Sequence, residues 1–597
     1  MQSMTPAVED APPIEDEART GRRAWLQQAA ALAAGAAATP LLPREAGAQT
    51  KSARYGGLLG QLGQQASWRS LEARLVRRSG FGITPADFSH ARTLGYQAYL
   101  EEQLAWESID DRGCDDHLAT AYAAFFQLTT PQAIAFANAN NSNFTVVSPA
   151  QRIAVERAIL SKRQLLEQMV EFWRDHFNVY VWSAFSLQPW HERSVIRPHA
   201  LGTVGALVRA SMRSPAMLHY LDQPLNTRWG INENYARELM ELFTLGEGTG
   251  YTEPDVQAAA RVLTGWSIQL QNGGNPIIPQ TIFVPFLHDS TDKQFSGFFN
   301  NTVVQGATGP NAGQIELNAL LDMIFTKDEV SLHICRELYR FFVHGDISPQ
   351  AETDVIEPLA QLFRNNVGAP DQMRIVLEAL FTSEHFFSAD IVACMVKSPA
   401  DFVVGTLREL DMPMPDATVP EAQYRVWTEV YALMGYCGQS IGEPPNVAGW
   451  PAYYQVPQYD EMWMDSASFA IRKQVYEYFT AVGFSTPADL YDPASAGLTF
   501  KVDLVALVQQ FSNAANPNIL VAEAAELLFT VPVSQGVRDQ LKTGYLLLGQ
   551  TNDSYWTSAY LTYVADPNTT DPVAQLVPLL LAGLFVDMQG AAEHQLI

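Results

Sequence analysis

The sequence has little cysteine for its length, and this restricts the metal and redox sites that it can build. Four cysteines occur among 597 residues, and they are Cys114, Cys335, Cys394 and Cys437. No two of them have the short spacing of a zinc knuckle or of a redox dithiol, which excludes both kinds of site. One or two disulfides in an oxidising compartment and buried free thiols both stay open as interpretations.

Positive charge is scarce too. Lys and Arg number 38 against 64 Asp and Glu, which gives a net charge of −26. Binding to a nucleic-acid backbone requires a basic surface that releases counterions, so we predict no nucleic-acid partner. An acidic surface of this kind either binds cations or keeps the protein in solution, and composition does not choose between them.

Long apolar runs are also missing. The longest candidate, residues 576–586, falls short of the ~18 residues that span a bilayer, so we predict no transmembrane anchor. Alternating β-patterns are scarce, while hydrophobic residues make up 47% and charged residues 17% of the chain. This balance is typical of a packed globular protein rather than a disordered one.

The N-terminal segment resembles a twin-arginine export signal. Arg22 and Arg23 precede an Ala/Gly-rich run over residues 29–42, and Ala46-Gly47-Ala48 matches a signal-peptidase site. We therefore expect residues 1–48 to be removed and the protein to be exported to the periplasm or outside the cell by the twin-arginine machinery. The acidic residues before the pair depart from the usual positive start, and a helical N-terminus with an accidental arginine pair is the alternative.

Recurrent helix punctuation predicts an all-α fold, a multi-helix globular assembly of packed helical hairpins with long irregular loops. Thr84-Pro85 offers an N-cap and a first-turn proline, and Gly95 ends that helix. Further helices are expected at 151–176, 193–213, 232–245, 253–263, 315–325, 329–343, 373–382, 398–410 and 571–585. The expected regions are a signal segment (1–48), an N-terminal helical region (49–146), a central region (147–313), a helical region (314–411) and a C-terminal helical region (412–597).

Three segments interrupt the helical pattern. Residues 137–143 are rich in Asn, residues 271–313 are rich in Gly, Asn and Pro, and residues 412–420 are rich in Pro. These compositions predict loops. The second segment is longer than an ordinary loop, so we expect it to be a small β-like excursion or a functional lid within the central region.

The densest polar helix covers residues 232–246. At about 100° per residue, one face carries Glu233, Asn234, Arg237, Glu238 and Glu241, while apolar residues occupy the other. Three carboxylates around one guanidinium can hold a divalent cation, or can separate their pKa values so that one acts as acid and another as base. A solvent-exposed ladder of i,i+4 ion pairs is the alternative.

Histidines lie in polar-aromatic segments on both sides of this helix. His176 borders an apolar stripe, His199 falls in the next expected helix, and His288-Asp289 lies in the long irregular segment. Each histidine is a candidate ligand or acid/base group, and each can equally be an ordinary capped core residue or part of a polar turn. Histidine combined with carboxylates suits a first-row divalent metal, or calcium where oxygen dominates.

Large aromatic residues gather in two groups, which are Trp182, Trp190, Trp229 and Trp266, and then Trp450, Tyr453, Tyr454 and Trp463. They suggest either sugar-stacking platforms or core packing. The chain has no Walker loop, no G-x-G-x-x-G after a strand, no G-x-S-x-G elbow and no H-E-x-x-H. ATP, dinucleotide, serine-hydrolase and ordinary zincin interpretations therefore lose most of their support.

Taken in order, ten segments of the chain resemble the bacterial domain-of-unknown-function 1800 family (DUF1800). They are residues 75–82, 172–177, 197–202, 215–222, 232–246, 251–256, 263–266, 288–289, 397–399 and 444–451. The Asn-Glu-Asn-Tyr-Ala-Arg-Glu string at 232–238 is the most specific. The resemblance implies a mostly helical exported protein, frequently encoded beside a sulfatase-like protein, and it assigns no activity. The acidic leader and the insertion near Asn140 depart from the family pattern.

Two main hypotheses follow. The first is an exported enzyme, metal- or carboxylate-dependent and hydrolytic, that acts on an envelope or extracellular polymer. Its catalytic candidates are Glu238, Glu241, Arg237, His176 and His288, and its substrate-binding candidates are Asn232, Glu233, Asn234, His199, Trp266 and Asp289. The second is a non-catalytic binding or assembly protein that is exported with the sulfatase-like partner, and a redox metalloprotein is a weaker third. The enzyme hypothesis requires His176, Glu238, Glu241 and His288 to converge on one pocket.

Overall fold

Helices make up most of the described chain in a computed structural model, which confirms the all-α prediction. The structure describes residues 69–122, 144–180, 187, 191–272, 275–414, 420–486 and 498–597. The chain divides into two units, Met1–Gly57 and Leu58–Ile597. The expected export signal, the Asn-rich stretch, Trp182 and Trp190 lie outside the described residues, and the expected region boundaries stay predictions.

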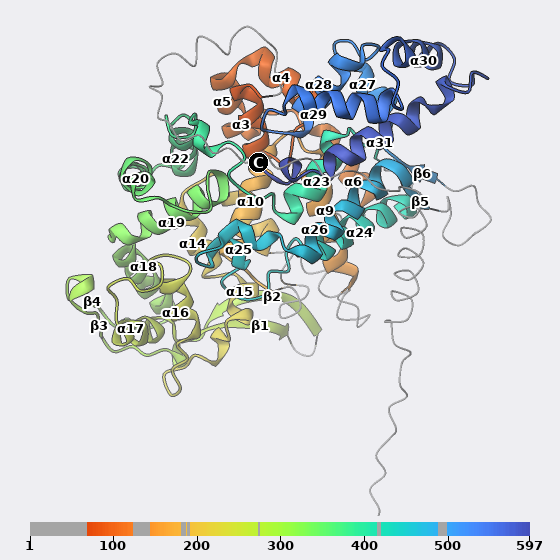
Figure 1. The fold of residues 1–597 in the computed structure, drawn as a ribbon. Coiled ribbons are helices and arrows are strands. Elements are labelled where there is room, and N and C mark those ends of the chain that lie inside the picture. The colour runs from red at the N-terminus through yellow and green to blue at the C-terminus, as the bar shows by residue number, and fades with distance from the viewer. Residues whose placement is uncertain are drawn as a thin grey trace, which may run out of the picture. The chain divides into compact units, whose positions relative to one another are not determined.

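Among the first described helices, the one that begins at Pro85 starts and ends where its punctuation predicts. Ser70 caps one by accepting from the N–H of Ala73, and Thr84 forms a capping box with Asp87 in front of Pro85. Gly95 has φ +82° and ends that second helix. With the labels of Figure 1, this part comprises α3 (Leu71–Ser79), α4 (Pro85–Leu94), α5 (Tyr96–Leu104), α6 (Arg112–Ala121), α9 (Phe144–Leu160) and α10 (Gln164–His176).

The single helix expected over residues 151–176 is two helices, α9 and α10. Asp111 stabilises the turn between these two helices, because it accepts hydrogen bonds from Ser161 Oγ at 2.7 Å and from the Lys162 N–H at 2.9 Å. α10 then runs through the interior, where every side chain from Gln164 to Arg174 is buried. It contacts α3, α5 and α9, so the residues at its C-terminal end have fixed positions.

The middle of the chain adds short helices and two ribbons. The helices are α13 (Arg197–His199), α14 (Val204–Ser211), α15 (Pro215–Tyr220), α16 (Asn234–Glu241), α17 (Glu253–Leu263), α18 (Ala312–Ile324), α19 (Asp328–Phe342), α20 (Pro349–Ala351), α21 (Glu357–Asn365) and α22 (Gln372–Phe381). The bounds of α17 match the expected helix. α16 is shorter than the expected 232–245, because the chain turns after Glu241 and reaches Gly246 at φ +92°.

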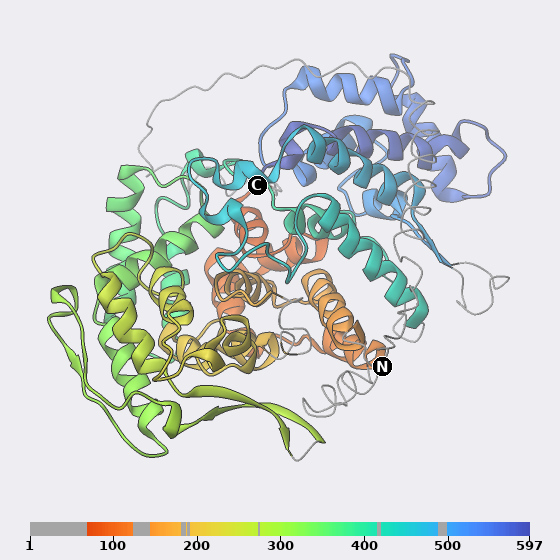
Figure 2. The same ribbon diagram turned by 90° about the horizontal axis from the view of Figure 1, so that it is seen from below.

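The long irregular segment is in part the β-like excursion that its composition suggested. β1 (Trp266–Asn272) pairs antiparallel with β2 (Asn275–Phe283), and β3 (Lys293–Gln294) pairs with β4 (Val303–Val304). The register joins Trp266 to Phe283 and shifts at a bulge between Gln269 and Gln271. Figure 2 shows the first ribbon as a long arm, and its strands contact α15.

The C-terminal part is again helical apart from one short ribbon of β5 (Phe484–Thr486) and β6 (Leu498–Phe500). Its helices are α23 (Pro399–Glu409), α24 (Pro420–Tyr436), α25 (Pro451–Tyr454), α26 (Ser466–Glu477), α27 (Leu504–Gln509), α28 (Pro517–Leu528), α29 (Gln535–Leu541), α30 (Ser554–Ala565) and α31 (Val577–Gln589). Among the described residues, no helix combines the length and apolar character needed to cross a bilayer.

All four cysteines are free thiols, and three of them are buried. Burial raises the pKa of Cys335 to about 12 and that of Cys437 to about 11. These thiols are therefore protonated at neutral pH and behave as small core residues. The sequence left disulfides and free thiols open as interpretations, and in the structure the cysteines are free thiols.

Candidate functional site

The polar helix α16 has the two faces that its sequence predicts. Tyr235, Ala236, Leu239 and Met240 are buried, whereas the acids and Arg237 are at least partly exposed. Arg237 donates to Glu253 at 2.6 Å and to Glu233 at 3.3 Å. Because Glu253 is 66% exposed, this part of the face is an ion-pair ladder at the surface, and such pairs contribute little free energy.

His176 lies at the C-terminal end of α10 and faces the segment that follows α16. Its Nε2 is 3.3 Å from the carbonyl oxygen of Phe243, and its ring lies 5.7 Å from the ring of His333 on α19. Burial, and then the neighbouring His333, lower the pKa of His176 to about 3. The imidazole is therefore neutral. A carbonyl only accepts, so Nε2 carries the hydrogen and Nδ1 is left with a lone pair.

A pocket of about 260 Å³ brings His176 and Glu241 together. We call it the acidic pocket, and its lining consists mainly of polar and aromatic residues from α10, α16, α19 and α25 and from the segments beside them. They are Phe172, Asp175, His176, Glu241, Leu242, Glu247, His333, Glu337, Phe341, Ala448, Tyr453 and Tyr454. Figure 1 shows α10, α19 and α25 close to one another, and α19 contacts α25.

Asp175 is the acidic residue on which this pocket is built. Its Oδ1 accepts from the main-chain N–H of Trp450 at 2.8 Å. Gly449 has φ +87°, and a Cβ added there would lie 2.5 Å from the Asp175 carboxylate. Burial raises the pKa of Asp175 well above its ordinary value; the Trp450 hydrogen bond opposes this shift, and the charges of Glu171 and Glu337 add to it. Asp175 is thus a carboxyl group held toward its neutral form.

Glu337 lies in the same pocket and has a cationic partner. Its Oε1 accepts from Arg340 Nη1 at 2.8 Å, and both side chains are mostly buried. The pocket therefore contains one carboxyl group that is held toward its neutral form and one carboxylate that forms an ion pair with a guanidinium.

Glu238 points to a different place from Glu241. It is half-buried and does not line the acidic pocket. Burial, and then the charge of Glu241, raise its pKa to about 7, while Arg237 opposes the shift. Glu238 also raises the pKa of Tyr220 on α15. It therefore lies between α15 and α16, outside the pocket that contains His176.

His288 and Asp289 belong to a separate buried network. His288 Nε2 is 3.0 Å from Glu316, and its Nδ1 is 2.9 Å from the Thr264 carbonyl oxygen. Lys293 forms an ion pair with the same Glu316 carboxylate, and Asp289 accepts from Arg261 at 2.7 Å. These contacts hold the loop around Asp289 to α17 and α18. The convergence of four residues that the enzyme hypothesis required is present for His176 and Glu241 alone.

The remaining candidate residues of the sequence analysis lie at separate places in the structure. Asn232 Oδ1 accepts from the Asn234 N–H at 3.0 Å, so it shapes the start of α16. His199 Nδ1 is 2.7 Å from the Val195 carbonyl oxygen. Trp266 lines a second, larger pocket beside the β1–β2 ribbon. Within the described ranges, no group of three or more His, Cys, Asp and Glu side chains is arranged to hold a metal ion.

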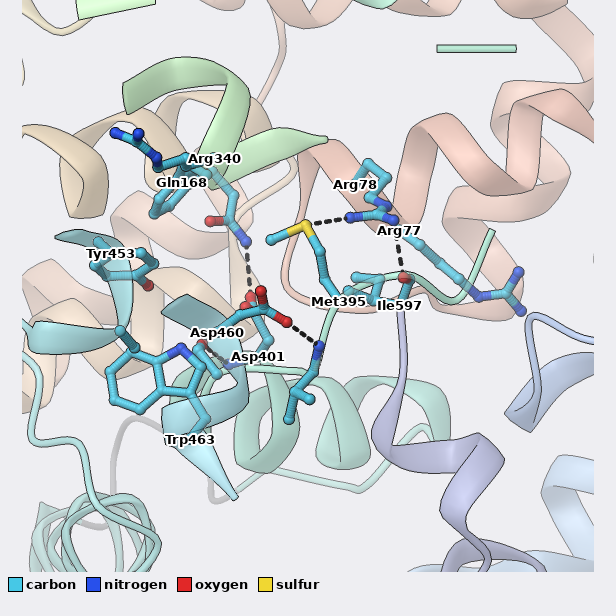
Figure 3. A pocket seen from close by; sticks show the side chains of 14 residues that line it. Arg77, Arg78, Gln168, Arg340, Met395, Asp401, Tyr453, Asp460, Trp463 and Ile597 are labelled. Atoms are coloured by element: carbon cyan, nitrogen blue, oxygen red, sulfur yellow. Dashed lines mark hydrogen bonds between the residues drawn. The ribbon is translucent and has the colours of Figure 1, made fainter. Parts of the chain in front are cut away.

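A small internal cavity adjoins the acidic pocket, and Figure 3 shows its lining. Phe341 and Tyr453 line both spaces. On one side Gln168 donates to Asp401 at 3.1 Å, and on the other Arg78 donates to the main-chain oxygen of Ile597 at 2.8 Å. The cavity has room for about 30 Å³, which is about one water molecule, so it cannot hold a substrate.

A family model described as "Protein of unknown function (DUF1800)" matches residues 74–570. The chain belongs to the DUF1800 family. Neither a curated protein nor a solved structure matches it. In this DUF1800 chain, the family-like segments at 172–177, 232–246 and 444–451 meet at the acidic pocket, through His176, Glu241 and Ala448 respectively.

Sequence reasoning missed three functional candidates of this DUF1800 protein: Asp175, His333 and Glu337. Asp175 lies beside His176 in a segment already recognised as family-like. His333, Glu337 and Phe341 lie four residues apart on α19, so a test for one polar-aromatic helix face could have found them. Their meeting with His176 could not be read from the sequence, because it depends on how α19 packs against α10.

Proposed function

We propose that the acidic pocket is the active site of a hydrolase that cleaves an envelope or extracellular glycan. The observation that carries this proposal is that Asp175, whose pKa is raised by burial, shares the pocket with Glu337, which forms an ion pair with Arg340. Two carboxyl groups in different electrostatic surroundings are the arrangement that general acid–base hydrolysis uses. Glu337 is one of the charges that raise the pKa of Asp175, so the two groups influence each other.

In the proposed reaction, Asp175 donates its proton to the oxygen of the glycosidic bond that breaks. Glu337 takes a proton from the water that attacks the sugar carbon, and the products carry the elements of that water. Glu241 accepts hydrogen bonds from sugar hydroxyls, and the free Nδ1 of His176 does the same. The roles of Glu238, Arg237 and His288 in catalysis are not part of this proposal, because they do not line the pocket.

The shape of the pocket supports a chain-like substrate. Its volume of about 260 Å³ lies just below the roughly 300–1,000 Å³ of typical small-molecule pockets. Phe172, Phe341, Tyr453 and Tyr454 supply aromatic walls on which the apolar faces of sugar rings can pack. A pocket of this size and lining suits one sugar unit of a polymer better than a large cofactor.

Export would bring the protein to the compartment that contains the proposed substrate. The twin-arginine pair and the Ala46-Gly47-Ala48 site support removal of residues 1–48 and release outside the cytoplasm, where envelope glycans are found. A chain exported by this route folds before it crosses the membrane, so its acidic pocket would form in the cytoplasm.

The decisive experiment uses the chain from Gln49 onward with purified peptidoglycan as the probe, and measures the release of reducing ends. We expect Asp175→Asn and Glu337→Gln each to lower the rate about 10²- to 10⁴-fold. Glu253→Gln, which removes a surface carboxylate outside the pocket, should leave it unchanged. Full activity in Asp175→Asn, or no release by the wild type, would refute the proposal.

A second candidate function is binding and assembly with the sulfatase-like partner. The observation that favours it is an exposed apolar group: Leu225 and Phe286 are both 67% exposed, Trp229 is 60% exposed and Ile231 is 39% exposed. The rings of Trp229 and Phe286 lie 4.9 Å apart, and Arg228 covers both. Apolar groups of this kind on a surface mark interaction sites. Trp229→Ser with Phe286→Ser should abolish co-purification with that partner at an unchanged unfolding temperature.

A further inference from the structure

A second pocket, of about 530 Å³, lies between residues 191–196, α14, α15 and the β1–β2 ribbon. Its lining includes Ser194, Arg213, Ser214, Trp266 and Thr281, and it shares no described lining residue with the acidic pocket. The other walls are largely apolar, from Val195, Ala210, Pro215, Ala216 and Pro279 among others. This volume falls within the range of ordinary small-molecule pockets.

Ser214 is placed as a helix cap but does not act as one. It is the N-cap residue of α15, yet its side chain makes no capping hydrogen bond. Its Oγ instead lies 2.8 Å from Nδ1 of His191, and both residues are only 4% exposed. A serine hydroxyl within hydrogen-bond distance of an imidazole nitrogen is the arrangement of an activated nucleophile and its base.

The His191 ring is held in its neutral form. Burial lowers its pKa to about 4, and the carbonyl of Phe177 opposes this shift. Among the described residues, Nε2 of His191 has no hydrogen-bond partner of normal geometry, although the Phe177 carbonyl is close enough to influence the ring. The base form is therefore populated throughout the physiological range. A base of such low pKa is weak, so slow acyl transfer is expected.

The third feature of this pocket is the indole N–H of Trp266. Trp266 is 8% exposed, and within the described part of the chain its buried Nε1–H has no hydrogen-bond partner. An unpaired buried N–H costs free energy, which an acceptor atom of a bound ligand would recover. Trp266 lines the same pocket as Ser214, so a ligand there can reach both residues.

We propose that this pocket is a second active site, in which Ser214 is acylated by a mainly apolar carboxylic ester. Ser214 Oγ attacks the carbonyl carbon, and His191 Nδ1 accepts the serine proton. The C–O bond to the alcohol then breaks, and the alcohol leaves with that proton. Water later adds to the acyl carbon while His191 Nδ1 takes one of its protons. The bond between the acyl carbon and Ser214 Oγ then breaks, His191 returns that proton to Ser214 Oγ, and the free acid leaves. Trp266 Nε1–H donates to an oxygen of the ester.

This proposal is independent of the acidic pocket, and no G-x-S-x-G elbow announces it in the sequence. Serine–histidine pairs recur on unrelated folds and are identified by their geometry rather than by their position in the chain. Ser194 supplies an internal comparison, because it is exposed, lines the same pocket, and has no hydrogen bond to an imidazole among the described contacts.

The test is covalent labelling of the folded chain with an alkyl fluorophosphonate, which transfers phosphorus to an activated serine and releases fluoride. Intact mass and peptide mapping should find one adduct, on Ser214. Ser214→Ala should remove the adduct and Ser194→Ala should retain it. His191→Gln should slow labelling at least about 10-fold. If that variant does not fold, His191→Asn provides the same readout.

Three outcomes would overturn the proposal: no adduct on the wild type, an adduct on Ser194 instead, or an unchanged labelling rate in a folded His191 variant. Trp266→Phe keeps the ring and removes the N–H. It should raise the probe concentration that gives half-maximal labelling rate, while the limiting rate changes less. An unchanged half-maximal concentration would remove Trp266 from the proposed site.

Discussion

The carboxylate of Asp175 accepts a hydrogen bond of 2.8 Å from the main-chain N–H of Trp450, which lies 275 positions further along the chain. Gly449, the residue before Trp450, lies directly against the same carboxylate. The segment 446–451 is therefore shaped around an acid at the end of α10. This contact explains why the loop before α25 belongs to a pocket whose other walls come from α10, α16, α19 and α25.

The first prediction concerns the packing of Gly449. Gly449→Ala should lower the free energy of unfolding by about 1–2 kcal/mol, because alanine is strained at a positive φ. The collision of its Cβ with Asp175 should lower it by about 1–3 kcal/mol more. Gly438→Ala is the matched control, because Gly438 has φ +107° and a Cβ added there would meet no other atom within 4 Å. Denaturant unfolding of both variants measures the difference. Equal losses would show that Asp175 does not press against this loop.

The second prediction is a pH dependence from Glu238. Its pKa rises from 4.5 to about 7 on folding, chiefly through burial. The native state therefore binds the proton more tightly, so this contribution to stability is complete below about pH 4.5 and is lost as the pH rises through about 7. The stability advantage of the wild type over Glu238→Gln should shrink across that interval, measured by denaturant unfolding at several pH values.

Glu253→Gln is the control for this titration, because the sign of its effect is opposite. Arg237 lowers the pKa of Glu253 through a direct hydrogen bond. The advantage of the wild type over Glu253→Gln should therefore be lost as the pH falls rather than as it rises. A pH profile of Glu238→Gln that parallels that of the wild type would contradict the assignment.

The third prediction separates stability from activity in the His288 network. Glu316 and Lys293 are fully buried, so Glu316→Gln leaves a buried ammonium without its counter-charge. We expect a loss of about 3–5 kcal/mol in the free energy of unfolding. Glu352→Gln removes the partner of Arg336 in a partly exposed pair and should cost about 0–1 kcal/mol.

His288→Gln extends the same prediction. It should lower the unfolding temperature and leave the folded protein fully active in the assays for both proposed sites, because His288 lines neither pocket. A specific loss of activity without a loss of stability would return His288 to the catalytic residues.

The fourth prediction concerns export. Arg22→Lys combined with Arg23→Lys should retain the full-length chain in the cytoplasm, whereas the wild type should be recovered outside it with Gln49 as its first residue. Cell fractionation and N-terminal sequencing measure both. Substitution of Arg19 with Lys, just before the pair, is the control and should leave export intact. Export of the double variant would favour the accidental arginine pair.

The sequence predicted correctly those features that depend on interactions between neighbouring residues. The capping box at Thr84, the bounds of α17 and the two faces of α16 depend on residues a few positions apart, and these can be read along the chain. Of the four residues expected to converge, His176 and Glu241 line one pocket. The expectation for Glu238 and His288 failed, because each has partners in another part of the fold that no spacing reveals.

By itself the sequence determined the helical class, the family, the acidic character and most helix starts, since capping and periodicity act between neighbouring residues. Only the tertiary structure decided which polar groups share a cavity. Asp175, Glu337 and Trp450 come together through the packing of α10, α19 and the loop before α25, and the same holds for Ser214 and His191 beside Trp266. Burial changes the chemistry of such groups, and burial is a property of the whole packed chain.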